Sequence, residues 1–304
     1  MTINRRPFVN SYTCLLFLFA LILFSCSRGQ EKQNSLSGSV QNIQNTARPF
    51  LALSTLPQEY FARRIGGDRI QTMVLAGSGQ NPHSYEPNPV QLQALSGADV
   101  WMLSGTEFEI ALEPRIRNLF PSLKIVDGTE GIHFRMAEDE PDIDRHTWLG
   151  SEGAQIMALH IRDALCGMDE ANSAFYSENY SELAADIQRE FGKLRTELEG
   201  LRGKTILVYH PAFGYFLDEF GIIQEAIEAD GKEPSPRMLA QIIEKAKSEK
   251  VRVIFVQAQF PAESVRTIAA EVGAELVVLD PLAPDWLGNI RIMGEALKRA
   301  AQSN

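Results

Sequence analysis

Two runs of alternating strand-like and helix-like segments lie on either side of one long helical stretch, and this pattern limits the fold more than any other feature. The stretch from Ala171 to Leu201 contains no proline. Its apolar residues recur every three or four positions, as on one face of a helix; they are Leu183, Ile187, Phe191, Leu194, Leu198 and Leu201. About 30 helical residues would span roughly 45 Å, enough to cross two domains. A coiled-coil dimerisation helix is the alternative, but the apolar stripe is short and both ends lead into strand–helix patterns. We therefore favour a helix packed against two domains of one chain.

The flanking segments are typical of parallel sheets covered by helices. The strand candidates are Phe50–Ser54, Ile70–Leu75, Val100–Leu103 and Lys124–Asp127 before the long helix, and Thr205–Tyr209, Ile222–Ile227, Val251–Val256 and Leu276–Leu279 after it. Helical stretches are expected at Leu56–Ile65, Phe108–Phe120, Phe213–Phe220, Arg237–Glu249 and Glu263–Val272. Asn88-Pro89 and Ser235-Pro236 each have the pattern of an N-cap followed by a first-turn proline. The predicted fold is α/β, with two lobes built on parallel sheets and joined by a single long rigid helix.

The N-terminus has the features of a secretion signal. Arg5 and Arg6 precede an uncharged apolar run, Leu15–Phe24, which is shorter than the roughly 20 residues of a bilayer span. The run ends in Leu23-Phe24-Ser25-Cys26, which resembles the lipobox of bacterial lipoprotein signals. In that class the cysteine is lipidated and becomes the mature N-terminus, so Cys26 is the expected lipidation site. The alternative is an ordinary secretory signal with a chance cysteine.

These patterns divide the chain into five segments. A signal peptide (1–25) is followed by a polar segment rich in Gln, Asn and Ser (26–48), expected to be a lipid-anchored flexible tether. An N-terminal α/β lobe (49–170), the linker helix (171–201) and a C-terminal α/β lobe (202–304) complete the division.

Net charge and cysteine content argue against a nucleic-acid-binding protein and against a fold stabilised by disulfides. The formal net charge is −10, so binding to nucleic acid through its phosphates is not expected. Of three cysteines, Cys14 lies in the signal and Cys26 would carry lipid. Only Cys166 then remains, so the mature chain would have no internal disulfide. Cys166 falls on a helical pattern and is expected to be a buried, small apolar residue.

Four potential metal ligands recur at near-even intervals: His83, His146, His210 and Asp280, with gaps of 63, 64 and 70 residues. Three imidazoles and one carboxylate suit a divalent metal of borderline softness. If the spacing reflects a repeated strand–helix architecture, two ligands come from each half of the chain. The metal would then lie in the cleft between the halves.

The sequence around these residues resembles a known family. Five blocks in order are similar to signatures of the metal-binding solute receptors of ABC importers, the zinc and manganese receptors of the ZnuA/TroA type. They are AGSGQNPHSYEPNP (76–89), DRHTWLG (144–150), VYHPAFGYFLDEFGI (208–222), GKEPSPRMLAQII (231–243) and LDPLAP (279–284). The resemblance covers residues 50 to 300 approximately.

The resemblance implies two α/β lobes joined by a rigid helix, with a metal between them held by His83, His146, His210 and Asp280. The chain departs from the pattern at two positions next to the second histidine. Arg145 stands where the family has proline, and Gly150 stands where it has aspartate. Neither position is a ligand, but the loop around His146 is expected to differ.

The identity of residue 210, a histidine, helps to distinguish a zinc receptor from a manganese receptor. Family members with a carboxylate there are usually manganese receptors, whereas a histidine resembles the zinc group. The chemistry agrees, because imidazole suits zinc and carboxylate oxygen suits manganese. Zn²⁺ is therefore the expected metal, with Mn²⁺ as the alternative.

The other residues near these motifs are not expected to be main metal ligands. Trp148 is expected to pack beside His146 and shield the site, and His160 to be a structural or surface residue. His133 is at best an auxiliary metal contact. Glu233 is expected to organise the helix start at Ser235, and the acidic run Glu138–Asp144 to be a solvated loop. That loop contains no histidine tract, so a metal-capturing role is not expected.

The resulting hypothesis is a monomeric, non-enzymatic solute-binding protein that captures Zn²⁺ and delivers it to an ABC importer permease with its ATPase. It would lie outside the cytoplasmic membrane of a bacterium, anchored through Cys26. A metalloenzyme is disfavoured, since four protein ligands leave no open position and no HExxH motif is present. A surface adhesin is secondary, because no residue specifies a host ligand. A siderophore or cobalamin receptor on the same scaffold would need a wide cleft without four converging ligands.

Overall fold

The computed structural model describes residues 48–136, 143–228, 232–257, 259–260 and 263–302. These residues belong to one compact unit, Thr46–Asn304. The predicted signal peptide, most of the tether with Cys26, and most of the acidic run fall outside the described residues.

The N-terminal lobe is built on a four-stranded parallel sheet in the order β2-β1-β3-β4. Its elements are β1 (Phe50–Thr55), α1 (Leu56–Gly66), β2 (Gln71–Ala76), α2 (Pro89–Leu95), β3 (Val100–Leu103), α3 (Glu107–Leu119) and β4 (Lys124–Asp127), followed by α4 (Ser151–Met168).

The C-terminal lobe repeats this topology with a second parallel sheet, ordered β6-β5-β7-β8. Its elements are β5 (Thr205–Val208), α6 (Gly214–Asp218), β6 (Ile223–Ala226), α7 (Pro236–Ser248), β7 (Val253–Gln257), α8 (Glu263–Val272), β8 (Glu275–Leu279) and α9 (Trp286–Gln302). The predicted class, two α/β lobes with parallel sheets, is confirmed.

Local sequence explains where several helices begin and end. Asn88 caps α2: its side chain accepts hydrogen bonds from the N–H groups of Val90 and Gln91, and Pro89 occupies the first turn. Ser235 caps α7 in the same way. Pro114 lies inside α3, and the helix continues past it.

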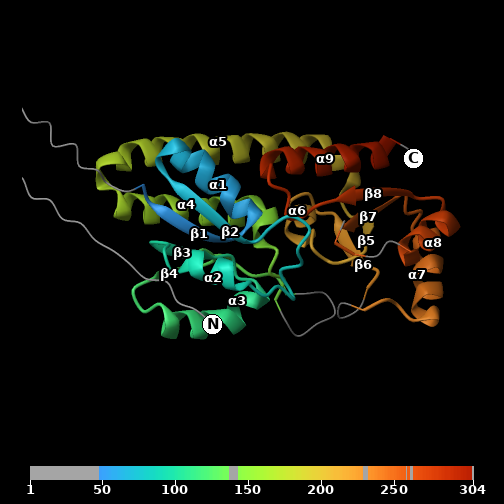
Figure 1. The fold of residues 1–304 in the computed structure, drawn as a ribbon. Coiled ribbons are helices and arrows are strands. Elements are labelled where there is room, and N and C mark those ends of the chain that lie inside the picture. Colours follow the sequence, from blue (N-terminus) through green and yellow to red (C-terminus); the bar gives the residue numbers. More distant parts are fainter. Residues whose placement is uncertain (1–47, 137–142, 229–231, 258, 261–262, 303–304) are drawn as a thin grey trace, which may run out of the picture. The chain divides into compact units, whose positions relative to one another are not determined.

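The long helix is α5 (Ser173–Glu197), flanked by short 3₁₀ turns at Glu170–Asn172 and Glu199–Leu201. It packs against α1, α4 and α9 of its own chain (Figure 1). Its apolar face is fully buried, with Leu183, Ile187 and Phe191 at 0 % exposure. The apolar stripe therefore serves as a packed linker, and the segment predicted as one helix loses its first and last turns to 3₁₀ geometry.

The hydrophobic core is continuous between the lobes. One cluster runs from Leu51 and Leu53 in β1, through the buried face of α5, to Phe255 in β7 and Trp286 in α9. Smaller clusters cover the other face of each sheet, beneath α2 and α3 in one lobe and beneath α7 and α8 in the other. Each sheet is thus buried on both faces, as parallel sheets require.

The sequence patterns predicted only part of α4 and did not predict α9. The helical pattern around His160 and Cys166 belongs to α4, an 18-residue helix, and α9 follows the last strand for 17 residues. Both contribute buried residues to the shared core. Within the described part of the chain, no helix is long and apolar enough to cross a membrane.

Candidate metal centre

The strand ends of both sheets supply three of the four candidate ligands. His83 lies in the loop after β2, His210 lies two residues after β5, and Asp280 directly follows β8. His146 precedes the 3₁₀ turn Thr147–Leu149 that leads into α4. Parallel α/β sheets place ligands beyond the carboxyl ends of their strands, where the strand order reverses. His210, after the central strand β5, occupies such a position.

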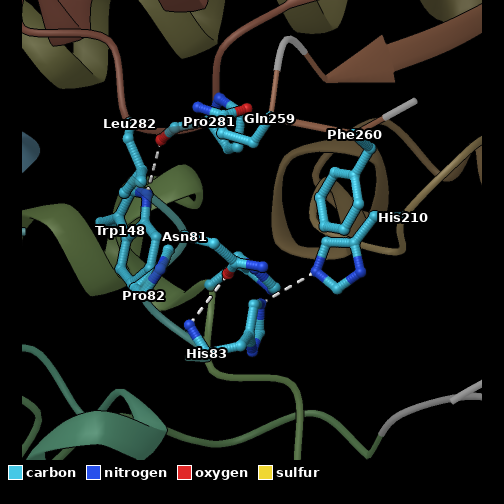
Figure 2. A pocket seen from close by; sticks show the side chains of 10 residues that line it. Asn81, Pro82, His83, Trp148, His210, Gln259, Phe260, Pro281 and Leu282 are labelled. Atoms are coloured by element: carbon cyan, nitrogen blue, oxygen red, sulfur yellow. Dashed lines mark hydrogen bonds between the residues drawn. The ribbon is translucent and has the colours of Figure 1, made fainter. Parts of the chain in front are cut away.

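The structure brings His83, His146 and His210 together. One ring nitrogen of each lies within 4.8 Å of the others. Their ring centroids are 4.8 to 5.3 Å apart. Figure 2 shows His83 and His210 directed at one another, with their Nε2 atoms 3.0 Å apart. Two nitrogens on one tetrahedral zinc ion would be separated by about 3.3 Å, so the spacing suits chelation.

Each of the three histidines directs its Nδ1 atom at a different carboxylate. The distances are 3.0 Å from His83 to Glu107, 2.9 Å from His146 to Asp144, and 2.6 Å from His210 to Glu228; Asp144 and Glu228 are each 3 % exposed. A carboxylate that accepts the Nδ1 proton fixes the tautomer and leaves Nε2 as the coordinating nitrogen. No sequence pattern predicts that these three carboxylates are the acceptors.

The proton arrangement favours a cation at the centre. With Nδ1 protonated on His83 and His210, both Nε2 atoms present lone pairs across 3.0 Å. Such lone pairs repel unless a cation or proton lies between them. Burial lowers the pKa of His210 to about 4 against the opposing effect of Glu228, so this imidazole is neutral at pH 7. Neutral imidazole is the form that binds metal.

Asp144 remains ionised despite its burial. Burial raises the pKa of a carboxyl group, but the hydrogen bonds from His146 and Arg135 outweigh it and lower the pKa of Asp144. Asp144 had been expected to lie in a solvated loop. That expectation is wrong for this residue, because its carboxylate is enclosed between His146 and Arg135.

Asp280 is not part of the three-histidine group. Its Oδ1 atom accepts hydrogen bonds from the Gln259 side chain at 2.8 Å and from the N–H of Leu282 at 2.9 Å. The two residues that follow Asp280, Pro281 and Leu282, line the cavity that contains the histidines. The structure thus places Asp280 beside the site but does not direct its carboxylate at all three imidazoles.

Apolar and aromatic residues enclose the site. The three histidines line a small cavity that is partly open to solvent. Phe260 stacks on His210, as Figure 2 shows, and their ring centroids are 4.9 Å apart. The rings of Trp148 and His146 pack edge to face, with centroids 5.5 Å apart. Trp148 also donates from Nε1 to the carbonyl of Pro281, which lies in the other lobe, at 2.8 Å. Trp148 therefore shields the histidines, as expected, and joins the lobes as well.

The remaining candidates lie elsewhere. His133 is 90 % exposed and contacts Glu152 at 3.3 Å, and His160 contacts the carbonyl of Glu130. Glu233 accepts a hydrogen bond from the hydroxyl of Tyr209, and Ser235 is the residue that caps α7. Cys166 is only partly buried, because it lies at the edge of the core between α4 and α5.

Comparison with known proteins identifies the family. The family model described as ZnuA, zinc-uptake complex component A, periplasmic, matches residues 52–300. The chain belongs to this family. Its members are solute-binding proteins of ABC transporters that bind metal ions, and they are not enzymes.

Individual relatives cover most of the chain. Two solved structures of ZnuA, one of them a zinc-bound deletion mutant, are 33 % identical, with TM-scores of 0.80 and 0.79; they cover 84 % of this chain and 100 % and 98 % of theirs. The high-affinity zinc uptake system protein ZnuA of Bacillus subtilis is 26 % identical over 74 % of this chain and 76 % of its own. The manganese ABC transporter substrate-binding lipoprotein PsaA of Streptococcus pneumoniae is also 26 % identical, over 84 % of each chain.

Proposed function

We propose that this protein captures Zn²⁺ outside the cytoplasmic membrane and delivers it to the permease of an ABC importer. The observation that carries the proposal is the convergence of three imidazoles, each with its Nδ1 atom on a carboxylate. This arrangement leaves three Nε2 atoms free to coordinate one cation. Three nitrogen donors favour zinc over manganese, which prefers oxygen ligands.

Asp280 is proposed as the fourth ligand. With three neutral histidines and a divalent cation, one carboxylate would lower the charge of the bound site to about +1. Its backbone position at the end of β8, beside the cavity, supports this role. Its carboxylate would have to turn from Gln259 toward the histidines.

Metal titration of the purified protein tests the site. We expect one Zn²⁺ per chain, bound more tightly than Mn²⁺ in competition with a chelator. His83→Ala, His146→Ala and His210→Ala should each weaken zinc binding strongly, and Asp280→Asn should weaken it less. His160→Ala is the matched control, because its Nε2 atom contacts the carbonyl oxygen of Glu130 and the residue is not part of the three-histidine group. Equal zinc affinity in wild type and His210→Ala would refute the site, and tighter binding of Mn²⁺ would refute the choice of zinc.

The lipid anchor is proposed at Cys26, in the lipobox-like run Leu23–Cys26. Several acyl chains are needed for stable attachment, because one chain binds a membrane only marginally. Cys26→Ala should therefore move the protein from the membrane fraction to a soluble extracytoplasmic fraction. Zinc uptake is measured in cells that produce Cys26→Ala and in cells that produce His210→Ala. The comparison separates the effect of membrane anchoring on zinc uptake from the effect of zinc binding. Unchanged membrane retention would refute the anchor.

A further inference from the structure

We propose that Arg135 is a positioning residue for the metal site. Arg135 holds His146 in place against α6, the helix that follows His210. This inference rests on the proposed function, because it concerns how one of the three candidate ligands is oriented. It assigns a role to a residue that no sequence motif singled out.

Arg135 reaches His146 through one buried carboxylate. Its Nη1 atom lies 3.1 Å from Oδ2 of Asp144. The other oxygen, Oδ1, accepts both the backbone N–H of His146 at 3.0 Å and its Nδ1 at 2.9 Å. Asp144 is therefore held on both oxygens, and its plane determines the direction of the imidazole. The position of Arg135 fixes that plane.

The backbone around Arg135 supports the same arrangement. The N–H of Asp144 donates to the carbonyl of Arg135 at 2.9 Å, and Met136 and Ile143 form an antiparallel bridge. The two short segments 135–136 and 143–144 thus lie side by side. Arg135 and Asp144 are therefore joined by a backbone hydrogen bond and by an ion pair between their side chains.

The second contact of Arg135 is with α6 of the C-terminal lobe. Its Nε atom lies 2.9 Å from Oδ2 of Asp218. The hydroxyl of Tyr215, also on α6, accepts from the N–H of Arg135 at 3.0 Å and donates to the carbonyl of Asp144 at 2.9 Å. Three contacts with α6 therefore hold the Arg135–Asp144 pair, and α6 begins four residues after His210.

The first residue of α6 leaves room for the guanidinium. A Cβ atom at Gly214 would overlap the Arg135 guanidinium and lie 2.8 Å from Oδ2 of Asp144. The guanidinium therefore packs directly over the backbone of α6. A side chain at position 214 would displace Arg135 without removing its charge.

These contacts have a consequence for metal binding. His146 belongs to the N-terminal lobe and His210 to the C-terminal lobe, and their ring centroids are 5.2 Å apart. Because Arg135 ties the acceptor of His146 to the helix next to His210, it sets the separation of two ligands from different lobes. Without it, Asp144 could rotate, and His146 would lose its fixed direction.

The test compares Arg135→Met with Arg135→Lys in metal-free protein titrated with Zn²⁺. Loss of a group that orients a ligand typically weakens metal binding by about 10–100-fold, and we expect that range for Arg135→Met. Lysine has a single ammonium group and cannot hold Asp144 and Asp218 in the same fork geometry, so Arg135→Lys should recover the affinity only in part. Gly214→Ala should weaken binding in the same direction while it keeps the arginine.

Arg195→Met is the matched control. Arg195, on α5, also forms an ion pair with the α6 region, through Glu219, but that pair does not contact a candidate ligand. Its zinc affinity should stay within about twofold of wild type. The ligand-field absorption of bound Co²⁺ supplies a readout that a general loss of stability does not move: it should change in Arg135→Met and not in Arg195→Met.

Three results would overturn the inference. They are a zinc affinity of folded Arg135→Met within twofold of wild type, equal losses in Arg135→Met and Arg195→Met, or an unchanged Co²⁺ spectrum in Arg135→Met. If Arg135→Met does not fold, Gly214→Ala and Arg135→Lys decide the question by the same criteria. A wild-type protein that binds no zinc would instead refute the proposed function.

Discussion

At the scale of single residues, the site depends on which ring nitrogen of each histidine carries a proton as much as on where the side chains lie. Each candidate histidine has a carboxylate on Nδ1, but those carboxylates come from very different distances along the chain: Asp144 is two residues from His146, whereas Glu228 is 18 residues from His210. A metal site needs these acceptors to fix the tautomer of each ring. The buried carboxylates are therefore the residues whose change should separate affinity from stability.

Glu228→Gln should lower zinc affinity about tenfold or more. The amide still accepts the Nδ1 proton of His210 but carries no charge, so it makes Nε2 a weaker donor. The fold should tolerate the change, because it removes a carboxylate that is only 3 % exposed and preserves its shape. Chelator competition measures the affinity, and thermal melting of the metal-free protein measures the stability.

Glu225→Gln is the control for this prediction. Glu225 lies on β6, three residues before Glu228. Its Oε2 atom pairs with Nζ of Lys245 at 2.7 Å, and it does not contact the histidines through this pair. Its zinc affinity should equal that of wild type. A loss of similar size in both variants would show that Glu228 has no particular role at His210.

Sequence patterns predicted the three histidines, both sheets and the long helix, but not the residues that orient the site. The candidate ligands lie in recognisable sequence motifs, whereas Glu107 and Glu228 lie outside the motif segments and meet their histidines only in the folded chain. Arg145, which replaces the proline of the family pattern, donates to the carbonyl of Gly105 at 3.1 Å and lies 3.5 Å from Glu107. Spacing along a sequence does not show such contacts between distant loops.

At the scale of secondary structure, α4 positions the second histidine. The 3₁₀ turn after His146 packs on the first turn of α4. Gly153 permits this close approach, since a Cβ atom there would overlap the carbonyl oxygen of Thr147 and lie 2.8 Å from its carbonyl carbon. The helical pattern around Cys166 indicates the later part of α4, but no side-chain cap marks the start of this helix, so its bounds could not be predicted.

Gly153→Ala should therefore both destabilise the protein and weaken zinc binding. The methyl group meets backbone, which cannot move aside as a side chain can, so a cost of about 1–3 kcal/mol in unfolding free energy is expected. The displaced turn carries His146 with it. Urea unfolding and zinc titration measure the two effects.

Gly167→Ala, in the same helix, is the matched control. A Cβ atom at Gly167 would meet nothing within 4 Å. Alanine in a helix is favoured over glycine by up to about 1 kcal/mol, so this variant should be as stable as wild type or more so, with unchanged zinc affinity. A stabilised Gly153→Ala protein with normal affinity would contradict the assigned packing.

At the scale of the whole unit Thr46–Asn304, the two lobes share one core and are fastened to each other next to the site. Trp148 of the N-terminal lobe donates to Pro281 of the C-terminal lobe, and Trp286 donates to the carbonyl of Trp148 at 2.7 Å. Both indoles are about 1 % exposed. Together with the face of α5 that contributes to the shared core, these contacts oppose independent movement of the lobes.

This architecture predicts one cooperative unfolding transition for both lobes, which zinc shifts as a unit. The candidate ligands come from both lobes and the core is continuous, so neither lobe should unfold alone. At a free zinc concentration about 1,000 times Kd, binding to the folded state should add about 4 kcal/mol to the unfolding free energy. His210→Ala should remove most of this gain. Hydrogen exchange of amides in β1 and in β7, followed through urea unfolding with and without zinc, reports on the lobes separately. Two distinct midpoints, or a zinc shift confined to one sheet, would contradict a unit held together by the shared core and the bound metal.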